Sequence, residues 1–582
     1  MSAVPEHSIR LWNAHSGRER SIMNRRQLKP FNRIYIFRIA AACCILCSIF
    51  SIRSPRASAE ISSPVIVRVG LNFAQNAVSQ TAFTSLAGVE AGILENGTFS
   101  GLFQSTAGAG FKVSKDGYGA GPWHVLAASL STFESALSDS ETLKKSGFAA
   151  VPAYMGGWMV LSGSYPDQAS AQAAATELSQ KTGRTQVRAV SSISPTDQDR
   201  SASLLRVADL SGDLLFLFSD NIKTLVFRSL VASSGGTVPV MAVNGGPRYR
   251  GWMEVSRLPE SDMTVVNILD MDDYLYGVVP AEIGASSPAE AIKAQAVVAR
   301  TYATYQISLK KHAKYGFDLC NTVDCQSYKG YDFEGADCSR YIAETRGKII
   351  TYTYPSGPKA GQKELAQVFY FSTSGGHTES CENVWYATLP YLVGVEDPYE
   401  PKDLPYSNWT ATLSTDQIIK MTGSVLARVS AVEVLRLTAS GRVYEVSVRG
   451  FQADGAPRTL TFLKEQARTK FSLKSQWYRV DSDTYITLLQ GSQTVRTGLT
   501  GNQVATAQGT LIPIPDTLTA CKVIGAGGKT VEIPSIPGNF TFVGKGWGHG
   551  VGMSQNGAIG MAKAGIAYDA IIMHYFTGIK IE

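Results

Sequence analysis

Residues 270–283 read DMDDYLYGVVPAEI, an apolar run that ends in one carboxylate, Glu282. A strong helix start follows within a few residues. Burial at such a position disfavours the charged form of a carboxyl, and we expect it to raise the pKa of Glu282 toward neutrality. A carboxylic acid that is still protonated near pH 7 is a suitable general acid. The alternative is an ordinary surface glutamate before a helix, which composition alone favours.

The sequence predicts a rigid helix directly after Glu282. Residues 287–290 read SPAE, which places Ser287 at the N-cap and Glu290 at the third helical position, a capping box with the favoured proline between them. A narrow stripe of small residues follows, and small residues allow close packing against a neighbour. Glu282 would then be held beside a fixed helix start, as a catalytic acid must be.

Arg300 lies near the middle of this expected helix. Its spacing leaves two roles open. The guanidinium either reaches a carboxylate of a sugar or peptide ligand, or pairs with an acidic neighbour in the protein.

Three potential metal ligands follow the helix: His312, Cys320 and Cys325 fall within fourteen residues. One imidazole and two thiolates suit Zn²⁺, although the spacing H-x7-C-x4-C is not a standard zinc motif. The alternative is a disulfide between the two cysteines. A fourth ligand would be water or one of three more distant residues, Cys338, Cys381 or His377.

Two glycine-rich segments predict the walls of a binding site. Residues 374–378 read SGGHT, and residues 544–555 read GKGWGHGVGMSQ. Glycines allow a backbone to approach a ligand closely, and an indole offers a flat face for a sugar ring. We expect substrate contacts from His377, Trp547, His549, Ser554 and Gln555. The alternative is a pair of tight turns that pack aromatic side chains.

The first 59 residues differ from the rest of the chain. They hold ten of the 54 basic and two of the 48 acidic residues, so the remaining 523 residues carry a net charge of −2. The high pI therefore gives no reason to expect binding to nucleic acid. A basic start, an apolar run over 34–52 and the sequence ASA at 57–59 predict a secretory signal or an uncleaved membrane anchor, and thus an exported protein.

Residues 60–118 open with a buried strand pattern and form an N-terminal strand region. Residues 119–192 follow the order βαββαβ, with Asp167 capping the second helix. The pieces GWMV at 157–160 and GSY at 163–165 resemble the sporulation-related repeat (SPOR) domain. That family binds glycan strands of peptidoglycan that have lost their stem peptides. A generic small α/β domain is the alternative.

Four separated motifs resemble the stage II sporulation protein D (SpoIID/LytB) family. They are residues 270–282, KAQAVVARTY at 293–302, SGGHT at 374–378 and GWGHGVGMSQ at 546–555. The resemblance runs from near residue 210 to the end, in a catalytic domain expected over residues 205–582, and we expect the strand at 65–71 to belong to the same domain. It implies an α+β fold, with a mixed two-lobed catalytic domain and an additional SPOR-like domain inserted in the first lobe.

The resemblance also implies an activity. Sporulation members of the family are lytic transglycosylases, the catalytic acid maps to Glu282 and a required arginine maps to Arg300. Some members bind zinc through one histidine and two cysteines, which here match His312, Cys320 and Cys325. The expected substrate is stripped peptidoglycan, and the expected partners are a cell-wall amidase and other engulfment proteins. The rivals are a non-catalytic amidase enhancer of the same family and a zinc-dependent cell-wall hydrolase.

Overall fold

The computed structural model describes residues 61–115, 121–192, 204–220, 222–231, 238–258, 261–385, 387–404, 407–490, 493–498, 503–505, 508–513, 520–524, 530–534 and 536–582. The expected leader, residues 1–59, lies outside the described residues. Helices and strands are mixed, as expected for the α+β class. In the described part of the chain, no helix combines the length and apolar character that a membrane crossing requires.

A seven-stranded sheet joins the N-terminal strand to the centre of the sequence. The strand expected near residue 65 is β1, which pairs with β16 so that Ile66 faces Asp270, and with β17 so that Gly70 faces Cys320. One strand therefore fixes both the start of the 270–283 stretch and the first cysteine of the predicted metal cluster. In sheet order the strands are β17 (Leu319–Cys320), β1 (Ile66–Asn72), β16 (Ser261–Asp270), β15 (Trp252–Leu258), β12 (Leu225–Ser229), β3 (Val89–Glu95) and β4 (Thr98–Gln104).

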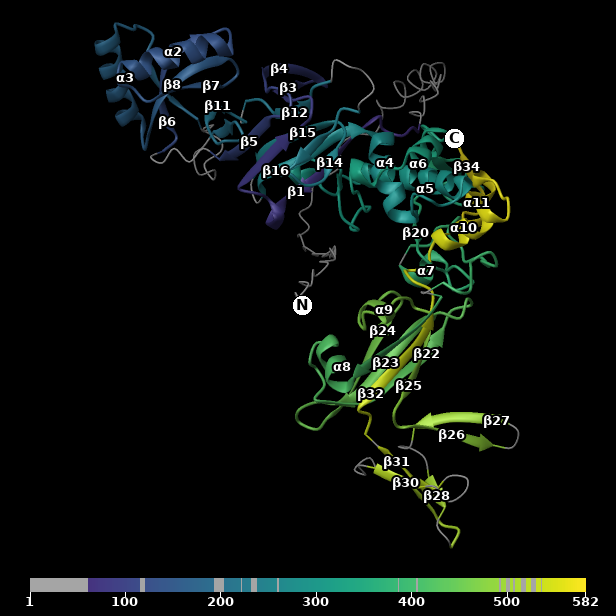
Figure 1. Ribbon diagram of the computed structural model, residues 1–582. Helices are drawn as coiled ribbons and strands as arrows, with labels where there is room; N and C mark the ends of the chain where they lie inside the picture. The colour runs from purple at the N-terminus through teal and green to yellow at the C-terminus, as the bar shows by residue number, and fades with distance from the viewer. Residues whose placement is uncertain are drawn as a thin grey trace, which may run out of the picture. The chain divides into compact units, whose positions relative to one another are not determined.

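A ten-stranded sheet contains the βαββαβ unit (Figure 1). In this unit the strand order is β7-β8-β6-β9, and both helices pack on those strands. As predicted, Asp167 caps the second helix by accepting the Ser170 amide at 2.8 Å. The unit consists of β6 (Trp123–Leu130), α2 (Phe133–Lys145), β7 (Ala150–Tyr154), β8 (Trp158–Tyr165), α3 (Gln168–Thr182) and β9 (Arg188–Ser191). The other strands are β14 (Arg248–Tyr249), β13 (Met241–Val243), β2 (Gln80–Thr84), β5 (Gly110–Lys115), β10 (Leu205–Ala208) and β11 (Leu214–Phe218).

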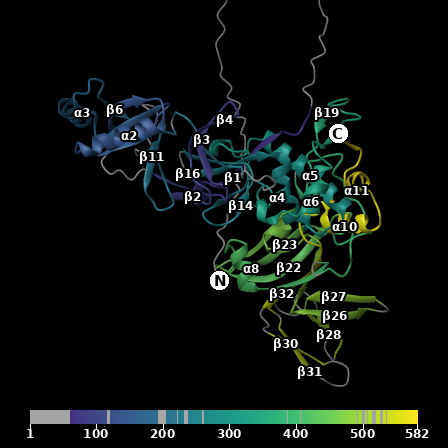
Figure 2. The ribbon, with the colours of Figure 1, turned by 45° about the horizontal axis from the view of Figure 1, so that its top comes forward.

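One helix, α5, is the packing centre around which four others lie (Figure 1, Figure 2). Its small side chains, including Ala296, Ala299 and Ala303, are fully buried, which confirms the expected close packing. The helices are α4 (Met271–Ile283), α5 (Ala289–Ser308), α6 (Ala336–Ala343), α10 (Gln555–Lys563) and α11 (Tyr568–Tyr575). Close by are β18 (Ile350–Thr353), β19 (Lys363–Leu365), β20 (Tyr370–Phe371), α7 (Cys381–Val384), β33 (Met553–Ser554) and β34 (Ile579–Ile581), with single turns η1 (Ala74–Asn76), η2 (Ala313–Tyr315) and η3 (Tyr331–Phe333).

The predicted capping box at residue 287 is wrong. The N-cap of α5 is Pro288, and the Ser287 hydroxyl instead donates to the Ile283 carbonyl at 2.7 Å. The stretch that was expected only to approach a helix is itself the helix α4. Because α4 ends so close to the start of α5, its last carbonyls compete for the serine and bind it. Glu282 is therefore the penultimate residue of one helix and is held near the start of the next.

Residues 407–545 form a separate core within the region expected as one catalytic domain. Two three-stranded sheets enclose buried side chains such as Trp409, Val446 and Phe542. The sheets are β21 (Asn408–Ser414), β32 (Asn539–Lys545) and β25 (Tyr478–Ser482), and β22 (Arg428–Leu437), β23 (Val443–Phe451) and β24 (Pro457–Leu463). This part also holds α8 (Thr415–Met421), α9 (Gln466–Thr469) and three hairpins, β26 (Tyr485–Gln490) with β27 (Gln493–Gly498), β28 (Gln503–Ala505) with β29 (Leu511–Pro513), and β30 (Ala520–Ile524) with β31 (Thr530–Pro534).

Candidate functional site

The Glu282 carboxylate is half-buried at the end of α4, so it is less enclosed than the sequence suggested. Its Oε1 accepts the backbone N–H of Ser327 at 2.9 Å. The Tyr370 hydroxyl also hydrogen-bonds to this carboxylate. Burial, reinforced by the nearby Glu282 charge, raises the pKa of Tyr370 well above its ordinary value, so the phenol stays protonated and able to donate. The carboxyl is thus oriented by a backbone amide and a neutral phenol.

A chain of polar side chains holds the Ser327 loop in place. The Tyr274 hydroxyl donates to Gln326 Oε1 at 3.1 Å, and Gln326 Nε2 donates to the Tyr370 hydroxyl at 3.1 Å. The Tyr328 hydroxyl donates to Asn267 Oδ1 at 2.7 Å. Three of these residues, Gln326, Ser327 and Tyr370, were missed from the sequence. The only indication of them in the sequence is that Gln326 and Ser327 directly follow Cys325.

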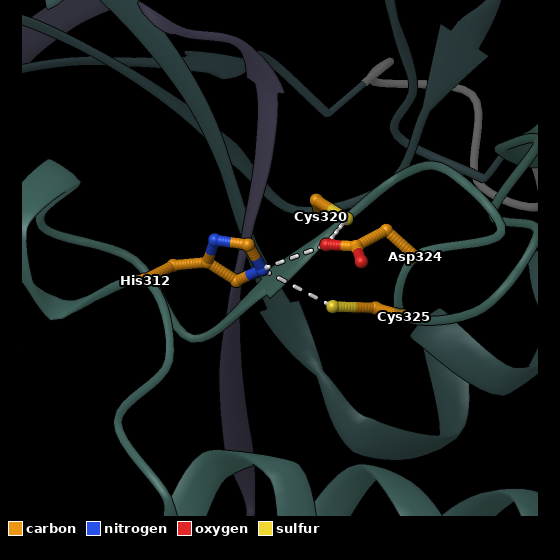
Figure 3. Close-up of side chains that lie close together, drawn as sticks. All are labelled: His312, Cys320, Asp324 and Cys325. Atoms are coloured by element: carbon orange, nitrogen blue, oxygen red, sulfur yellow. Dashed lines mark hydrogen bonds and ion pairs between the residues drawn. The ribbon is translucent and has the colours of Figure 1, made fainter. Parts of the chain in front are cut away.

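The three predicted metal ligands lie together, and a fourth residue joins them (Figure 3). The potential ligand atoms of His312, Cys320, Asp324 and Cys325 all lie within 4.8 Å of one another. His312 Nε2 is 3.2 Å from Cys325 Sγ. Nothing in the sequence indicated Asp324 as a fourth candidate, because an acid inside a loop has no local signal that marks it as a ligand.

Both cluster cysteines are free thiols, as are Cys338 and Cys381. The expected disulfide alternative therefore does not describe the structure. A hydrogen bond from the Cys325 thiol lowers the pKa of Cys320, and the same bond raises the pKa of Cys325. A lowered pKa favours a thiolate, which is the form that binds a metal.

The surroundings of the cluster keep the four residues in place. Three of them are buried, whereas the Asp324 side chain is 60% exposed. Lys311 Nζ lies 2.7 Å from Asp324 Oδ2 and directs this carboxylate toward the cluster. The His312 ring stacks on Phe317 with 4.9 Å between ring centres. The geometry therefore fits an ion with two sulfur, one nitrogen and one oxygen ligand.

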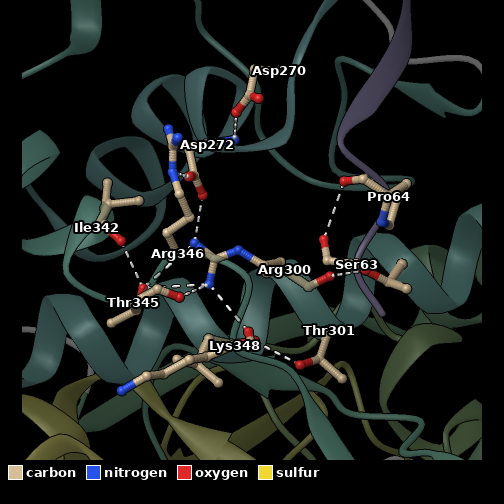
Figure 4. Close-up of polar contacts among 12 residues, drawn as sticks. Ser63, Pro64, Asp270, Asp272, Arg300, Thr301, Ile342, Thr345, Arg346 and Lys348 are labelled. Atoms are coloured by element: carbon tan, nitrogen blue, oxygen red, sulfur yellow. Dashed lines mark hydrogen bonds and ion pairs between the residues drawn. The ribbon is translucent and has the colours of Figure 1, made fainter. Parts of the chain in front are cut away.

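Arg300 has the second of its two predicted roles (Figure 4). Its side chain is fully buried, and Nη2 lies 2.7 Å from Asp272 Oδ1 in the first turn of α4. Nη1 donates to the Thr345 and Lys348 carbonyls at 2.8 and 3.2 Å. Burial lowers the pKa of Arg300, and the charge of Asp272 opposes this shift. Arg300 thus joins α5 to the start of α4, and we expect it to position Glu282 through that helix, since its own side chain is fully buried.

The two glycine-rich segments lie side by side. The amide of Trp547 donates to the Thr373 carbonyl at 2.8 Å, and the reverse bond measures 3.0 Å. Trp547 is 39% exposed, and the Lys474 ammonium lies 4.8 Å from the centre of its ring. His377 is half-buried, and its Nδ1 lies 2.6 Å from the Thr378 carbonyl, which identifies Nδ1 as the protonated nitrogen. Trp547 and His377 keep the exposure that a substrate contact requires.

Two of the other three expected substrate contacts are buried, and the third, His549, is half-buried. Ser554 is fully buried; it caps α10 through the Gly557 amide and donates to Glu400 Oε2 at 2.9 Å. Gln555 is buried beside it. The ring of His549 is packed against Phe369, Phe371 and Trp385. Burial corrects the expectation for Ser554 and Gln555, because a side chain buried within a packed loop reaches no ligand, whereas the half-buried His549 is not excluded by its exposure.

Sequence reasoning gave no role to a group of buried acids beneath the glycine-rich segments. Glu400 accepts the Gly375 amide at 2.7 Å, and Glu379 Oε2 accepts the hydroxyls of Thr438 and Ser440, both at 2.6 Å. The buried Arg442 donates to the Ser374 carbonyl at 2.7 Å. These bonds tie the 374–378 segment to the 407–545 core. These pairs could not be predicted from sequence spacing, since the partners are 25 to 68 positions apart.

Comparisons with known proteins match two regions of the chain to family models. A family model described as SpoIID, stage II sporulation protein, matches residues 259–352, and a SPOR domain model matches residues 119–188. An uncharacterised protein of Brachyspira hyodysenteriae is 31% identical over 56% of this chain and 70% of its own length.

The chain belongs to the stage II sporulation protein D family.

Two named relatives come from Bacillus subtilis (strain 168). A stage II sporulation protein D is 27% identical over 59% of this chain and 84% of its own length. An amidase enhancer is 27% identical over 53% of this chain but only 40% of its own length. A solved structure, a putative exported protein from Burkholderia pseudomallei K96243, aligns over 90% of this chain and 71% of that chain at 11% identity, with a TM-score of 0.12 that is too low to indicate a shared fold.

The SpoIID match contains much of the site described above. Glu282, Arg300 and the four cluster residues all lie within residues 259–352. Tyr370, His377 and Trp547 lie beyond it, and the fold brings Tyr370 into contact with Gln326 inside the matched segment.

Replacing Asp272 with Asn tests the positioning role of Arg300. The variant leaves the buried Arg300 guanidinium without its counter-charge, and we expect the free energy of unfolding to fall by about 3–5 kcal/mol. Urea denaturation measures the change. Asp337→Asn is the control, because the Asp337 side chain is 80% exposed and its loss should cost less than about 0.5 kcal/mol. Equal effects of the two variants would contradict the role.

His549 makes the stability depend on pH. Burial lowers its pKa to about 3, and its Nδ1 accepts the Val551 amide at 3.1 Å. Between pH 6.5 and pH 3 the unfolded chain binds a proton that the folded chain excludes, so the contribution of His549 to stability is lost as pH falls, by about 1.4 kcal/mol per pH unit. Urea titrations at pH 7 and pH 5 should show a smaller difference for His549→Gln than for the unchanged protein, whereas His574→Gln should keep the full difference.

Proposed function

We propose that this protein is a peptidoglycan lytic transglycosylase that cleaves stripped glycan strands between N-acetylmuramic acid and N-acetylglucosamine. The observation that carries the proposal is the setting of Glu282. One half-buried carboxyl, held by the Ser327 amide and the Tyr370 phenol, stands at a helix end. A hydrolase of the usual kind needs two facing carboxyl groups. The ring closure of a lytic transglycosylase needs only one.

In this mechanism Glu282 acts first as acid and then as base. It gives its proton to the glycosidic oxygen while the bond from that oxygen to C1 of the muramic residue breaks. The resulting carboxylate takes the proton of the sugar's own 6-hydroxyl, and O6 bonds to C1. The product is a 1,6-anhydro end, no water is consumed and Glu282 regains its proton. Tyr370 and the Ser327 amide hold the carboxyl in place through both steps.

The family membership and the SPOR domain support a role in cell-wall remodelling outside the cytoplasm. The relative named amidase enhancer supports an association with a cell-wall amidase. In this scheme the amidase strips the stem peptides, the SPOR domain binds the stripped strand, and the tethered catalytic domain meets its substrate at a raised local concentration. Engulfment during sporulation is the process, and other engulfment proteins are partners. The segment before residue 60 directs export, as a cleaved signal or a membrane anchor.

We also propose that His312, Cys320, Cys325 and Asp324 hold a zinc ion. The fit rests on four ligand atoms within 4.8 Å and on a thiol whose pKa is already lowered. Zinc bound there supplies folding energy by linking the four side chains. Cys325 is two residues from Ser327, so a fixed cluster also fixes the amide that orients Glu282. Asp324 fills the position that a zinc hydrolase keeps open for water, which favours a structural ion.

A non-catalytic amidase enhancer is the second candidate. The 27% identity to the relative of that name favours it, as does the incomplete burial of Glu282. In that case the same SPOR domain would deliver glycan to an amidase without cleaving it.

Glu282→Gln tests the reaction. Incubation of the full protein with stripped peptidoglycan, followed by mass spectrometry, should give anhydro-muramyl ends with the unchanged protein. The variant should reduce their rate at least about 100-fold, the loss expected when a general acid is removed. Glu433→Gln, a change of the same kind on β22, should retain full activity. Stimulation of an added amidase without any anhydro ends would instead identify an enhancer.

Metal analysis tests the cluster. Elemental mass spectrometry should find close to one zinc per chain, and His312→Ala or Cys325→Ala should lose it and unfold at a lower temperature. Cys338→Ala is the matched control, a buried cysteine outside the cluster that should keep the metal. Release of free stem peptides that stops on chelation would contradict the structural role and favour a zinc hydrolase.

A further inference from the structure

A groove lies against the loop that orients Glu282. It has a volume of about 590 Å³, which is enough for sugar rings of a glycan strand. One wall is the turn before β14 with Tyr249, and the other is formed by residues 321–323 and 327–329. Ser327 belongs to this wall, and its amide donates to Glu282. A ligand in the groove is therefore separated from the proposed acid by a single residue of backbone.

The charges around the groove leave one cation available. Asp332 is paired with Arg248, whose backbone and side-chain nitrogens donate to the two carboxylate oxygens at 2.8 and 2.7 Å. Lys329 also lines the groove, its side chain is exposed, and it forms no ion pair with any residue that the structure describes. Its backbone is fixed, since the Lys329 amide donates to the Gly277 carbonyl on α4 at 3.1 Å.

Apolar groups complete the lining. The Phe333 side chain is 53% exposed and the Val323 side chain is 88% exposed, both on the groove. An exposed ring beside a lone cation suits a sugar that carries a carboxylate, because the ring covers the apolar face of the sugar while the cation binds the acid. The groove thus combines the features of a site for an anionic sugar.

We propose that this groove binds the N-acetylmuramic residue of a stripped strand and that Lys329 pairs with its free lactyl carboxylate. The inference rests on the proposed function and adds to it a reason for substrate choice. Where a stem peptide is attached, the lactyl group is an amide and carries no charge. Removal of the peptide creates the carboxylate that Lys329 recognises. The groove thereby distinguishes stripped from intact strands independently of the SPOR domain.

A labelling experiment on the full-length Glu282→Gln protein tests the site directly. The probes are a tetrasaccharide of alternating N-acetylglucosamine and N-acetylmuramic acid with free lactyl groups, and the same compound with its lactyl groups converted to methyl amides. After mild acetylation, mass spectrometry reads the modification of individual lysines. The free acid should protect Lys329 and leave the exposed Lys563 unprotected, and the amide should protect neither. Equal acetylation of Lys329 with and without the free acid would overturn the proposal.

Kinetics provide the second readout. In the protein with an intact Glu282, Lys329→Gln should raise KM for stripped strands by about two- to fivefold, the upper part of the range for one exposed ion pair, with little change in kcat. Lys563→Gln is the matched control and should change neither. Every variant keeps the SPOR domain, so the contribution of that domain to KM is the same in all of them and does not affect the comparison. An unchanged KM in Lys329→Gln would overturn the proposal.

The two proposals fail separately. Normal anhydro products without protection of Lys329 would overturn the groove and leave the reaction intact. Protection of Lys329 without any anhydro product would overturn the transglycosylase and leave the groove as a glycan site of a non-catalytic protein.

Discussion

The hydrogen bond from the Ser327 amide to the Glu282 carboxylate depends on a loop that is fixed from several sides. Its start, Cys320, pairs with Gly70 of β1, and the cluster of His312 and three loop residues gathers its middle. Its end is held by Gln326 and by the Tyr328 hydroxyl on Asn267. Together these bonds restrict the loop to one conformation. The conformational entropy of the loop is therefore lost when the protein folds, and little more has to be lost when the carboxyl is oriented for a reaction. The candidate site, the candidate metal cluster and the groove all include residues of this one loop.

Two fully buried arginines connect the other parts of the site. Arg300 binds Asp272 and thereby joins α5 to the start of α4, whereas Arg442 binds the carbonyls of the 374–378 segment and joins it to the 407–545 core. A buried charge is tolerated only with partners of good geometry, so each arginine accepts few alternative arrangements of the chain around it. The buried Glu400 connects the glycine-rich C-terminal segment in a similar way, because it accepts both the Ser554 hydroxyl and the Gly375 amide. The residues of this segment that looked functional in sequence are in part the ones that hold it together.

Sequence reasoning found the chemistry of the site better than its geometry. The proximity of His312, Cys320 and Cys325 and the capped helix of the SPOR domain could be predicted because each depends on residue type and local spacing. The helix α4 was missed because its apolar character is nearly continuous and Pro280 lies inside it, which hides the helical period. Asp324 was missed as a ligand because an exposed acid in a loop has no local signal. The separate core of 407–545 was missed because its strands β21 and β32 pair over 125 residues or more.

By itself, the sequence determined which groups are available: one candidate acid, two thiols and an imidazole, a SPOR unit, and glycine segments that allow close backbone approach. These follow from covalent identity and from periods of two to four residues, which any short window displays. The tertiary structure alone decided which groups meet. It buried Arg300 and Ser554, left Trp547 exposed, brought Tyr370 to Glu282 and placed Lys329 beside a groove. The physical reason is that burial and pairing are properties of long-range packing, where the partner of a side chain is chosen by the whole core and not by its neighbours in sequence.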